Sequence, residues 1–472
     1  MSQKIALVGS GFLGLTLALR LAEQGNRVTV YESASEIGGL ASAWQIGDVV
    51  WDKHYHVTLL SDAFTRKIVE EIGLKDEFEW VETKTGFYTD GKLVSMSNAL
   101  EFLRFPPLGL IGKFRLGATI FYASRVKDWK ALEKISVEDW LTGLSGKKTF
   151  EKMWKPLLKA KLGEAYKETS AAFIWATIQR LYAARKSGLK REMFGYVRGG
   201  YARVLERFGE HLREKGVEIR LNERVERIEK MSDGKVEIFP AKAQRGKEEK
   251  ALAVQSAGLH LLSKDEFNVS KAKTEDRRPT TEDLFDQVIL TCPSSVAARI
   301  CPQLSAEEKT KLENVKYQGI VCASVLMKNS LSPFYVTNIT DDAPFTAVIE
   351  MSALVDKSEF GGNSLVYLPK YVAPDDVMFE KTDDEIKETF LTALEKMYAH
   401  FRRADVLEFK ISRVRQVFAL STLNYSANLP SMKTSLENVF IVNSAQITNG
   451  TLNVNETVAL AERALFELKQ IA

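Results

Sequence analysis

Residues 4–32 read KIALVGSGFLGLTLALRLAEQGNRVTVYE, and this stretch decides the fold that we expect. A short apolar run, typical of a buried parallel strand, is followed at once by a G-x-G-x-x-G segment, an amphipathic helix and a second strand. In such a unit the first glycine permits a tight turn, the second lets a pyrophosphate approach, and the third lets the helix pack closely. The helix N-terminus then offers free N–H groups and a positive dipole end to phosphates. The stretch therefore predicts a dinucleotide-binding βαβ unit.

The acidic residue that follows the second strand limits the type of dinucleotide that we expect to bind. Glu32 lies roughly 20 residues beyond the glycines, where a carboxylate that binds a ribose 2′-hydroxyl is expected. Because a carboxylate would repel a 2′-phosphate, the expected ligand is an ADP-ribosyl group without one. The residues expected to contact it are Gly9, Gly11, Phe12, Leu13, Gly14, Glu32 and Ser33.

A second glycine pair, in the stretch EIGGLAS at residues 36–42, favours flavin over nicotinamide. Glycine pairs are common in turns, but a nicotinamide site requires none here. Together with the first unit, the pair resembles the N-terminal signature of the flavin amine oxidase superfamily, which includes protoporphyrinogen oxidases, phytoene desaturases and, more distantly, UDP-galactopyranose mutases. Ile37 and Leu40 replace the usual arginines, which argues against the best-known amine oxidase branch. The resemblance implies FAD as the cofactor, with its pyrophosphate and ribityl chain along Gly38, Gly39, Leu40 and Ala41.

Later segments extend the resemblance over nearly the whole chain. A G-G, helix, strand arrangement at 195–229 would return the chain to the FAD domain, with Val225 meeting the adenine side through its backbone. After the C-terminal strand, Asn443 and Ser444 replace the family's Gly-Asp and can still hydrogen-bond the ribityl hydroxyls. Asn453 opens a helix whose N-terminus, in the family, points at the flavin pyrimidine oxygen and stabilises the anionic reduced ring.

The catalytic prediction rests on the stretch DKHYH at residues 52–56. It resembles the family's Asp-x-x-x-His segment beside the flavin ring, with Asp52 and His56 at the matching ends. Histidine changes charge near neutral pH, which suits a residue that polarises substrate or stabilises reduced flavin. We therefore predict a catalytic role for His56, with His54 as the alternative, and both on one strand face. A structural or metal-binding role stays open, although no third ligand at suitable spacing supports a metal.

The composition is that of a large globular enzyme. The chain has 472 residues, of which 45% are apolar and 27% charged, and its formal net charge is only +3. This length predicts two joined domains, and the small net charge gives no indication of a nucleic-acid partner. The three cysteines show neither even pairing nor metal-ligand spacing, so we expect no metal and a reducing, cytoplasmic compartment. No apolar stretch is long enough to span a bilayer.

The expected fold class is α/β (α+β), a Rossmann-like FAD-binding domain interleaved with a second, mixed-sheet and helical substrate domain. The ranges assigned to the FAD-binding domain are 1–75, 195–300 and 410–472, and those assigned to the substrate or cap domain are 76–194 and 301–409. A charged excursion at about 240–283 is typical of a solvated loop, with a docking site as the less favoured interpretation.

Residues 102–127 combine aromatic, aliphatic and basic side chains at helical spacing. Several members of the resembled family use this region to touch membranes or to line an apolar substrate tunnel. The favoured interpretation is a cap-domain helix packed on its own neighbours. Peripheral membrane attachment through a basic amphipathic stretch is the alternative. The sequence does not indicate an oligomeric state.

The leading hypothesis is an FAD-dependent oxidoreductase, an oxidase or dehydrogenase that transfers hydride from a small organic molecule to flavin N5. Its substrate could be apolar or glycosylated, and the sequence does not choose between these. Aromatic residues contribute strongly to both cores and apolar cavities. The aromatic candidates for the substrate cavity are Tyr317, Phe334, Tyr335, Tyr367 and Tyr371.

Two other functions stay open. A non-redox flavin enzyme of the UDP-galactopyranose mutase type would need cationic side chains that bind a diphosphate. The favoured interpretation of the cationic cluster in this chain is a solvent-exposed face of a helix. A flavin-binding or lipid-handling protein without turnover is the third possibility. The cationic cluster in question comprises Arg180, Arg185, Lys186, Lys190 and Arg191.

Overall fold

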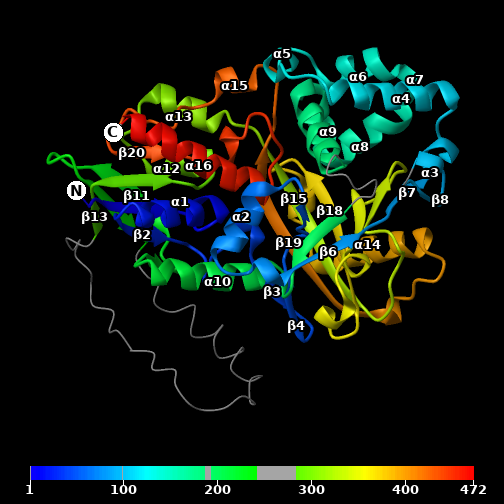
Figure 1. The fold of residues 1–472 in the computed structure, drawn as a ribbon, viewed down its shortest axis with the longest axis horizontal. Coiled ribbons are helices and arrows are strands. Elements are labelled where there is room, and N and C mark those ends of the chain that lie inside the picture. The colour runs from blue at the N-terminus through cyan, green and yellow to red at the C-terminus, as the bar shows by residue number, and fades with distance from the viewer. Residues whose placement is uncertain (1, 98, 186–192, 242–282, 472) are drawn as a thin grey trace.

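The computed structural model describes residues 2–97, 99–185, 193–241 and 283–471. Figure 1 shows a parallel sheet with its helices on the left, and a larger sheet with a group of helices above it on the right. The charged excursion falls almost wholly outside the described residues. Within the described residues, no helix is long and apolar enough to cross a membrane.

The first sheet is five-stranded and parallel, in the order β10-β2-β1-β14-β20. Its strands are β1 (Lys4–Val8), β2 (Arg27–Tyr31), β10 (Glu218–Arg220), β14 (Gln287–Leu290) and β20 (Val439–Ile441). Helices α1 (Phe12–Glu23), α10 (Gly200–Glu214) and α16 (Val454–Ile471) pack against it. Because helices cover such a sheet, its strands are apolar nearly throughout, as the sequence of β1 shows. The predicted Rossmann-like α/β class is confirmed.

The second sheet has seven strands in the order β19-β15-β18-β17-β16-β7-β8. Neighbouring strands are antiparallel except β16 and β7, which run parallel. All eleven residues of β15 are buried, because the strand lies inside the sheet and both faces are covered. The strands are β7 (Thr85–Thr89), β8 (Lys92–Ser95), β15 (Tyr317–Met327), β16 (Val336–Ile339), β17 (Ala347–Glu350), β18 (Ser364–Val372) and β19 (Val406–Ala419).

Three smaller sheets complete the strands that the structure describes. The hairpin of β3 and β4 leads from the parallel sheet toward the larger one, where the Trp51 ring packs edge-on against Phe360 at 4.8 Å. The domain boundaries expected near 194 and 409 fall inside β9 and β19. The strands of the small sheets are β3 (Ala43–Ile46), β4 (Val49–Asp52), β5 (Thr58–Leu59), β6 (Phe78–Glu82), β9 (Met193–Val197), β11 (Val225–Lys230), β12 (Val236–Pro240) and β13 (Leu284–Phe285).

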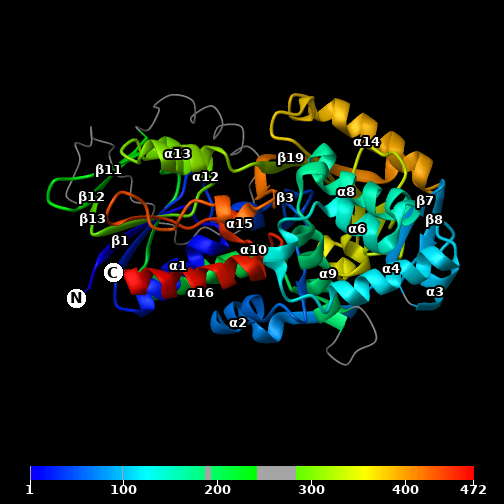
Figure 2. The same cartoon turned by 90° about the horizontal axis from the view of Figure 1, so that it is seen from above.

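A group of helices covers the larger sheet, and Figure 2 shows α4, α6, α8 and α9 side by side in it. Its members are α3 (Ala99–Arg104), α4 (Leu110–Ala123), α5 (Trp129–Leu132), α6 (Val137–Ser145), α7 (Lys147–Thr149), α8 (Lys155–Leu162) and α9 (Ala171–Arg185). The remaining helices are α2 (Ala63–Glu71), α12 (Ser294–Ile300), α13 (Ala306–Glu313), α14 (Asp383–Met397) and α15 (Tyr425–Asn428).

Candidate functional site

The first glycine loop has the geometry that a dinucleotide requires. Gly9 has a φ of 110°, which only glycine adopts readily, and a Cβ there would lie 2.7 Å from the Thr291 hydroxyl. A Cβ on Gly14 would lie 2.1 Å from the Gly9 carbonyl oxygen, so α1 packs directly on the loop. Apart from its two chain neighbours, none of the described residues has an atom within 4 Å of a Cβ on Gly11. The outer glycines are therefore needed for packing, and the middle one faces open space.

Helix α1 begins at this loop. Its N-cap is Gly11, and no side chain among the described residues caps it, so the N–H groups of the first turn are left for a ligand. The side chain of Phe12 is buried against Tyr201, at 5.4 Å between ring centroids, and Leu13 is buried too. Phe12 and Leu13 can therefore serve an anionic ligand through their backbone and not through their side chains.

Glu32 orders the loop from the end of β2. One carboxylate oxygen accepts hydrogen bonds from the Ser10 N–H at 2.9 Å and the Ser10 hydroxyl at 2.6 Å. The other accepts from the Ala34 N–H at 2.9 Å and the Ser33 hydroxyl at 3.2 Å. Glu32 is only half-buried and Ser33 is exposed. The carboxylate is therefore held beside the glycine loop, at the place predicted for a ribose hydroxyl.

The second glycine pair lies directly against the first loop. Gly38 and Gly39 have φ values of 117° and 57°, and the Gly38 N–H donates to the Ser10 carbonyl at 2.9 Å. Gly38 forms a parallel bridge with Gly11, and a Cβ on Gly39 would lie 3.3 Å from the Gly11 Cα. Two segments separated in sequence thus form one continuous glycine surface. Leu40 and Ala41 follow in the 3-10 turn η1 (Gly39–Ala41).

The C-terminal polar residues contact their own segment. Asn443 is buried, with its amide oxygen accepting from the Ala445 N–H at 3.0 Å and its amide nitrogen donating to the Ser294 hydroxyl at 3.2 Å. Ser444, which is half-buried, begins the next turn. The Asn453 side chain accepts from the Glu456 N–H at 3.0 Å, as the predicted cap of α16 requires. The Asn443 side chain therefore shapes the loop, and a ribityl contact at this position falls more readily to Ser444.

Val225 begins β11 and is buried opposite Pro240. The chain reaches it just after Asn222 and Glu223, whose N–H groups donate to the Ala34 and Glu32 carbonyls at 2.9 and 2.8 Å. These bonds bring the start of β11 to the end of β2. A backbone contact of Val225 with an adenine beside Glu32 is therefore consistent with the connectivity.

The expectation that His54 and His56 share a strand face is wrong, because β4 ends at Asp52 and both histidines lie in the bend before β5. The Nδ1 atom of His54 lies 3.3 Å from the Leu40 carbonyl oxygen, and its buried Nε2 atom has no partner among the described residues. Burial lowers the pKa of His54 to about 4. His54 is thus a neutral imidazole at physiological pH, held by the second glycine segment.

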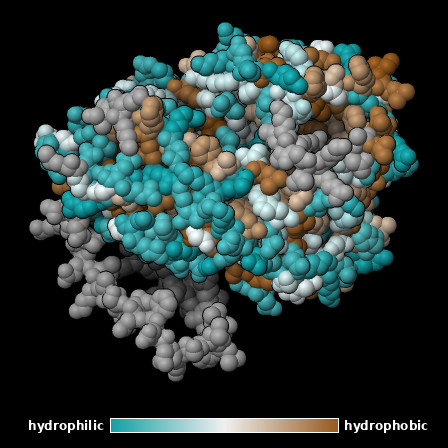
Figure 3. Space-filling view, viewed as in Figure 1, coloured by the Kyte–Doolittle hydropathy of each residue, from teal (hydrophilic) through white to brown (hydrophobic). Residues whose placement is uncertain are grey.

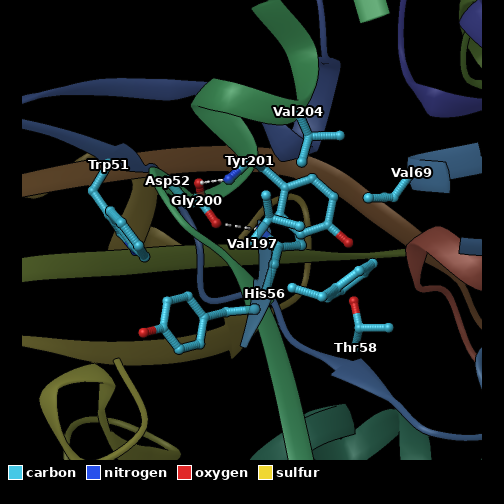
Figure 4. Close-up of a pocket in the computed structure, with 11 residues that line it drawn as sticks. Trp51, Asp52, His56, Thr58, Val69, Val197, Gly200, Tyr201 and Val204 are labelled. Atoms are coloured by element: carbon cyan, nitrogen blue, oxygen red, sulfur yellow. Dashed lines mark hydrogen bonds and ion pairs between the residues drawn. The ribbon is translucent and has the colours of Figure 1, made fainter. Parts of the chain in front are cut away.

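His56 has different neighbours, which Figure 4 shows. Its Nδ1 atom lies 3.6 Å from a carboxylate oxygen of Asp52, and its ring lies 5.0 Å from that of Tyr201. Asp52 is buried, and its carboxylate accepts from the Tyr201 N–H at 2.8 Å, at the N-terminus of α10. Burial raises the pKa of Asp52 despite these contacts. The two histidines therefore belong to separate groups, one against the glycine segment and one against α10.

Two of the predicted aromatic residues contact the 52–56 segment from the larger sheet. The Tyr367 hydroxyl donates to the Asp52 carbonyl, and the Tyr371 hydroxyl lies 2.9 Å from that of Tyr55. Sequence reasoning missed Tyr55, because it placed only the histidines of this segment at the site. The other predicted aromatic residues are buried in the core, and they are Tyr317, Phe334 and Tyr335.

The basic cluster gives little support to a diphosphate site. The Arg180 guanidinium donates to the Asp62 carboxylate at 2.8 Å, so its charge is already compensated. Lys186, Lys190 and Arg191 lie outside the described residues, as does the side chain of Arg185. No group of metal-ligating side chains occurs among the residues that the structure describes.

Comparison with known proteins agrees with this geometry. Residues 14–453 match the family described as flavin containing amine oxidoreductase. The chain is 21% identical over 477 residues to the zeta-carotene desaturase of a Synechocystis species, covering 93% of this chain and 92% of the desaturase. It is 28% identical over 142 residues to protoporphyrinogen oxidase 2 of Arabidopsis thaliana, covering 28% of each chain.

The fold is shared with solved structures at low sequence identity. An engineered putrescine oxidase superposes with a TM-score of 0.70 and 16% identity, covering 100% of both chains. The matched family and these relatives give the mutase alternative no support. Because the family model spans nearly the whole chain, the chain belongs to the flavin-containing amine oxidoreductase family and is an FAD-dependent oxidoreductase.

Proposed function

We propose that this chain oxidises an apolar organic molecule by dehydrogenation, as its desaturase and protoporphyrinogen oxidase relatives are named for doing. The observation that carries the proposal is the contact between β18 and the 52–56 segment. Through it, tyrosines of the larger sheet meet the segment that follows the glycine surface. Bound FAD supplies the hydride acceptor. The chain supplies a binding wall of aromatic side chains that excludes water.

We propose that His54 orients or polarises the substrate, because its Nε2 atom is buried and unpartnered among the described residues. The contact with the Leu40 carbonyl favours a proton on Nδ1, which leaves Nε2 as a hydrogen-bond acceptor. Because its pKa is about 4, His54 does not donate a proton as imidazolium at neutral pH. We propose that His56 positions this segment through Asp52 and α10.

Anaerobic reduction of the bound flavin tests the proposed function. The purified protein, loaded with FAD, is mixed without added reductant with a carotenoid, a porphyrinogen or a polyamine. We expect the carotenoid or the porphyrinogen to bleach the visible flavin absorbance. Bleaching by the polyamine alone would contradict an apolar substrate. A flavin that none of the three reduces would favour a binding protein without turnover.

Substitution of each histidine should separate the two groups. His54→Gln should keep the FAD content and slow flavin reduction by about 10- to 100-fold, since one positioned hydrogen-bonding group is lost. His56→Gln is the matched comparison. It should also lower the melting temperature, because it removes one of the groups that contact the buried Asp52 carboxylate. Stopped-flow reduction and thermal unfolding measure both effects. A normal reduction rate in His54→Gln would remove His54 from the reaction.

We also propose that α3 and α4 contact a lipid bilayer. On α4 the polarity is reversed, since Leu110, Ile111 and Phe114 are 77–78% exposed while Lys113 is buried and donates to the Leu103 carbonyl at 2.6 Å. Figure 3 shows apolar side chains gathered at the upper right, where Figure 1 places α3 and α4. The favoured interpretation of a helix packed on its neighbours thus holds for one face only. Exposed cations on α3, α5 and α7 and in the segment after α4 are Arg104, Arg125, Lys127, Lys130, Lys147 and Lys148.

A triple substitution tests the membrane surface. Replacing Leu110, Ile111 and Phe114 with serine should lower co-sedimentation with vesicles of phosphatidylcholine and phosphatidylserine by about 10- to 100-fold, because exposed apolar area is lost. FAD content should stay unchanged. Phe466→Ser, at an exposed apolar position on α16, is the control and should bind as the wild type does. Equal binding of the triple variant would show that another surface, or none, meets the bilayer.

A further inference from the structure

Lys161 occupies an unusual position on α8. Its ammonium nitrogen lies 3.0 Å from the Tyr371 hydroxyl, 4.1 Å from the centre of the Tyr371 ring and 5.4 Å from the centre of the Phe418 ring. The two rings are themselves packed edge to face, at 5.9 Å. The side chain is partly buried. A cation is thus held beside two aromatic rings at the surface of the larger sheet, where α8 packs against β18.

Among the described residues, no carboxylate compensates this charge. The other lysines of α8 differ in this respect, because Lys155 pairs with Glu151 at 2.8 Å and Lys159 pairs with Glu164 at 2.6 Å. The hydroxyls beside Lys161 carry no charge, since burial raises the pKa of Tyr371 to about 12 and raises that of Tyr55 well above its usual value. A partly buried ammonium without a counter-charge is costly, and an anion would offset that cost.

A chain of contacts links the cation to the cofactor segments. The Tyr371 hydroxyl that binds Lys161 also lies 2.9 Å from the Tyr55 hydroxyl. Tyr55 is flanked by His54, whose ring touches the Leu40 carbonyl of the second glycine segment. Two hydroxyls and one peptide step therefore connect the ammonium to the residues proposed to meet the flavin.

We propose that Lys161 binds the carboxylate of an otherwise apolar substrate, and so sets the class of molecule that this oxidoreductase accepts. The inference rests on the proposed function, because it concerns the same substrate site. An ammonium on two aromatic rings forms a charge-assisted hydrogen bond with a carboxylate and repels a cationic amine. Lys161 is a specificity residue that takes no part in the transfer of hydride.

The test compares decanoate with decan-1-ol as probes of the FAD-loaded protein, below the concentration at which either aggregates. Binding is followed through perturbation of the flavin visible spectrum. We expect decanoate to bind at least tenfold more tightly than decan-1-ol. Lys161→Met should abolish this preference, whereas Lys161→Arg should retain most of it. Lys159→Met removes a lysine two residues earlier on α8 that is already paired with Glu164. This variant should leave the preference unchanged.

The outcomes separate this inference from the proposed function. A wild-type protein without preference for decanoate, or a Lys161→Met variant that keeps it, overturns the inference. FAD content and anaerobic reduction by the three substrates report independently on the proposed function. Were Lys161→Met to lose FAD or fail to fold, Lys161→Gln would be measured in its place, with the same expected loss of preference.

Discussion

A Gly11→Ala variant should fold as the wild type does and purify with little or no FAD. Gly11 has φ and ψ values of −65° and 170°, which any residue adopts. In the part of the chain that the structure describes, no atom beyond the two neighbouring residues lies within 4 Å of the new methyl group. The substitution should therefore cause no strain in the folded protein. The methyl group would instead occupy the space over the glycine loop. Overpacking there should weaken FAD binding by roughly 10- to 100-fold.

Gly14→Ala is the matched control, because it adds the same methyl group to the same loop. There the new carbon would lie 2.1 Å from the Gly9 carbonyl oxygen, so α1 would have to move from the sheet. We expect this variant to be poorly folded, with FAD lost as a consequence. Circular dichroism and FAD titration of the purified apoproteins distinguish the two cases. Wild-type FAD affinity in Gly11→Ala would show that the open space at Gly11 is not part of the cofactor site.

The first βαβ unit could be predicted nearly residue by residue, because its signals are local. The strand, glycine segment, helix and strand expected within residues 4–32 occur in that order, with strands at Lys4–Val8 and Arg27–Tyr31. The helix starts at Phe12, inside the glycine segment, which supplies its first turn. Apolar runs, a glycine turn and a closing acid all act over a few residues. A single sequence therefore carries enough information to place them.

The catalytic segment could not be predicted in the same way. Alternation of His54 and His56 predicts a strand, but the strand ends at Asp52. The buried Asp52 carboxylate accepts a hydrogen bond from the Tyr201 N–H. Tyr201 lies 149 residues further along the sequence, so no local pattern predicts this contact. The Lys161 hydrogen bond to Tyr371 spans 210 residues and was missed for the same reason. The residues proposed to decide specificity are thus held by contacts between segments far apart in the sequence.

Glu350 gives the larger sheet a pH dependence that the sequence does not show. The residue ends β17 and is fully buried, and its carboxylate accepts from the Leu331 N–H at 2.9 Å and from the Ser352 hydroxyl. Burial raises its pKa from 4.5 to about 7, and these hydrogen bonds and the charge of Lys357 only partly oppose the shift. At pH values between 4.5 and about 7, Glu350 therefore keeps its proton in the folded state and has lost it in the unfolded state.

The free energy of unfolding should therefore fall as the pH rises from about 5 to 8. The contribution of Glu350 is fully present below pH 4.5 and is lost as the pH passes through about 7. A shift of this size corresponds to about 3 kcal/mol at most. Glu350→Gln mimics the protonated acid, so it should flatten the decline and raise stability at pH 8 above that of the wild type. Urea unfolding of the FAD-loaded proteins at pH 5, 6, 7 and 8 measures this difference. Glu79→Gln, which changes a side chain that is 46% exposed, is the control and should leave the fall of stability with pH unchanged. If Glu350→Gln showed the same fall as the wild type, another group would be responsible for it.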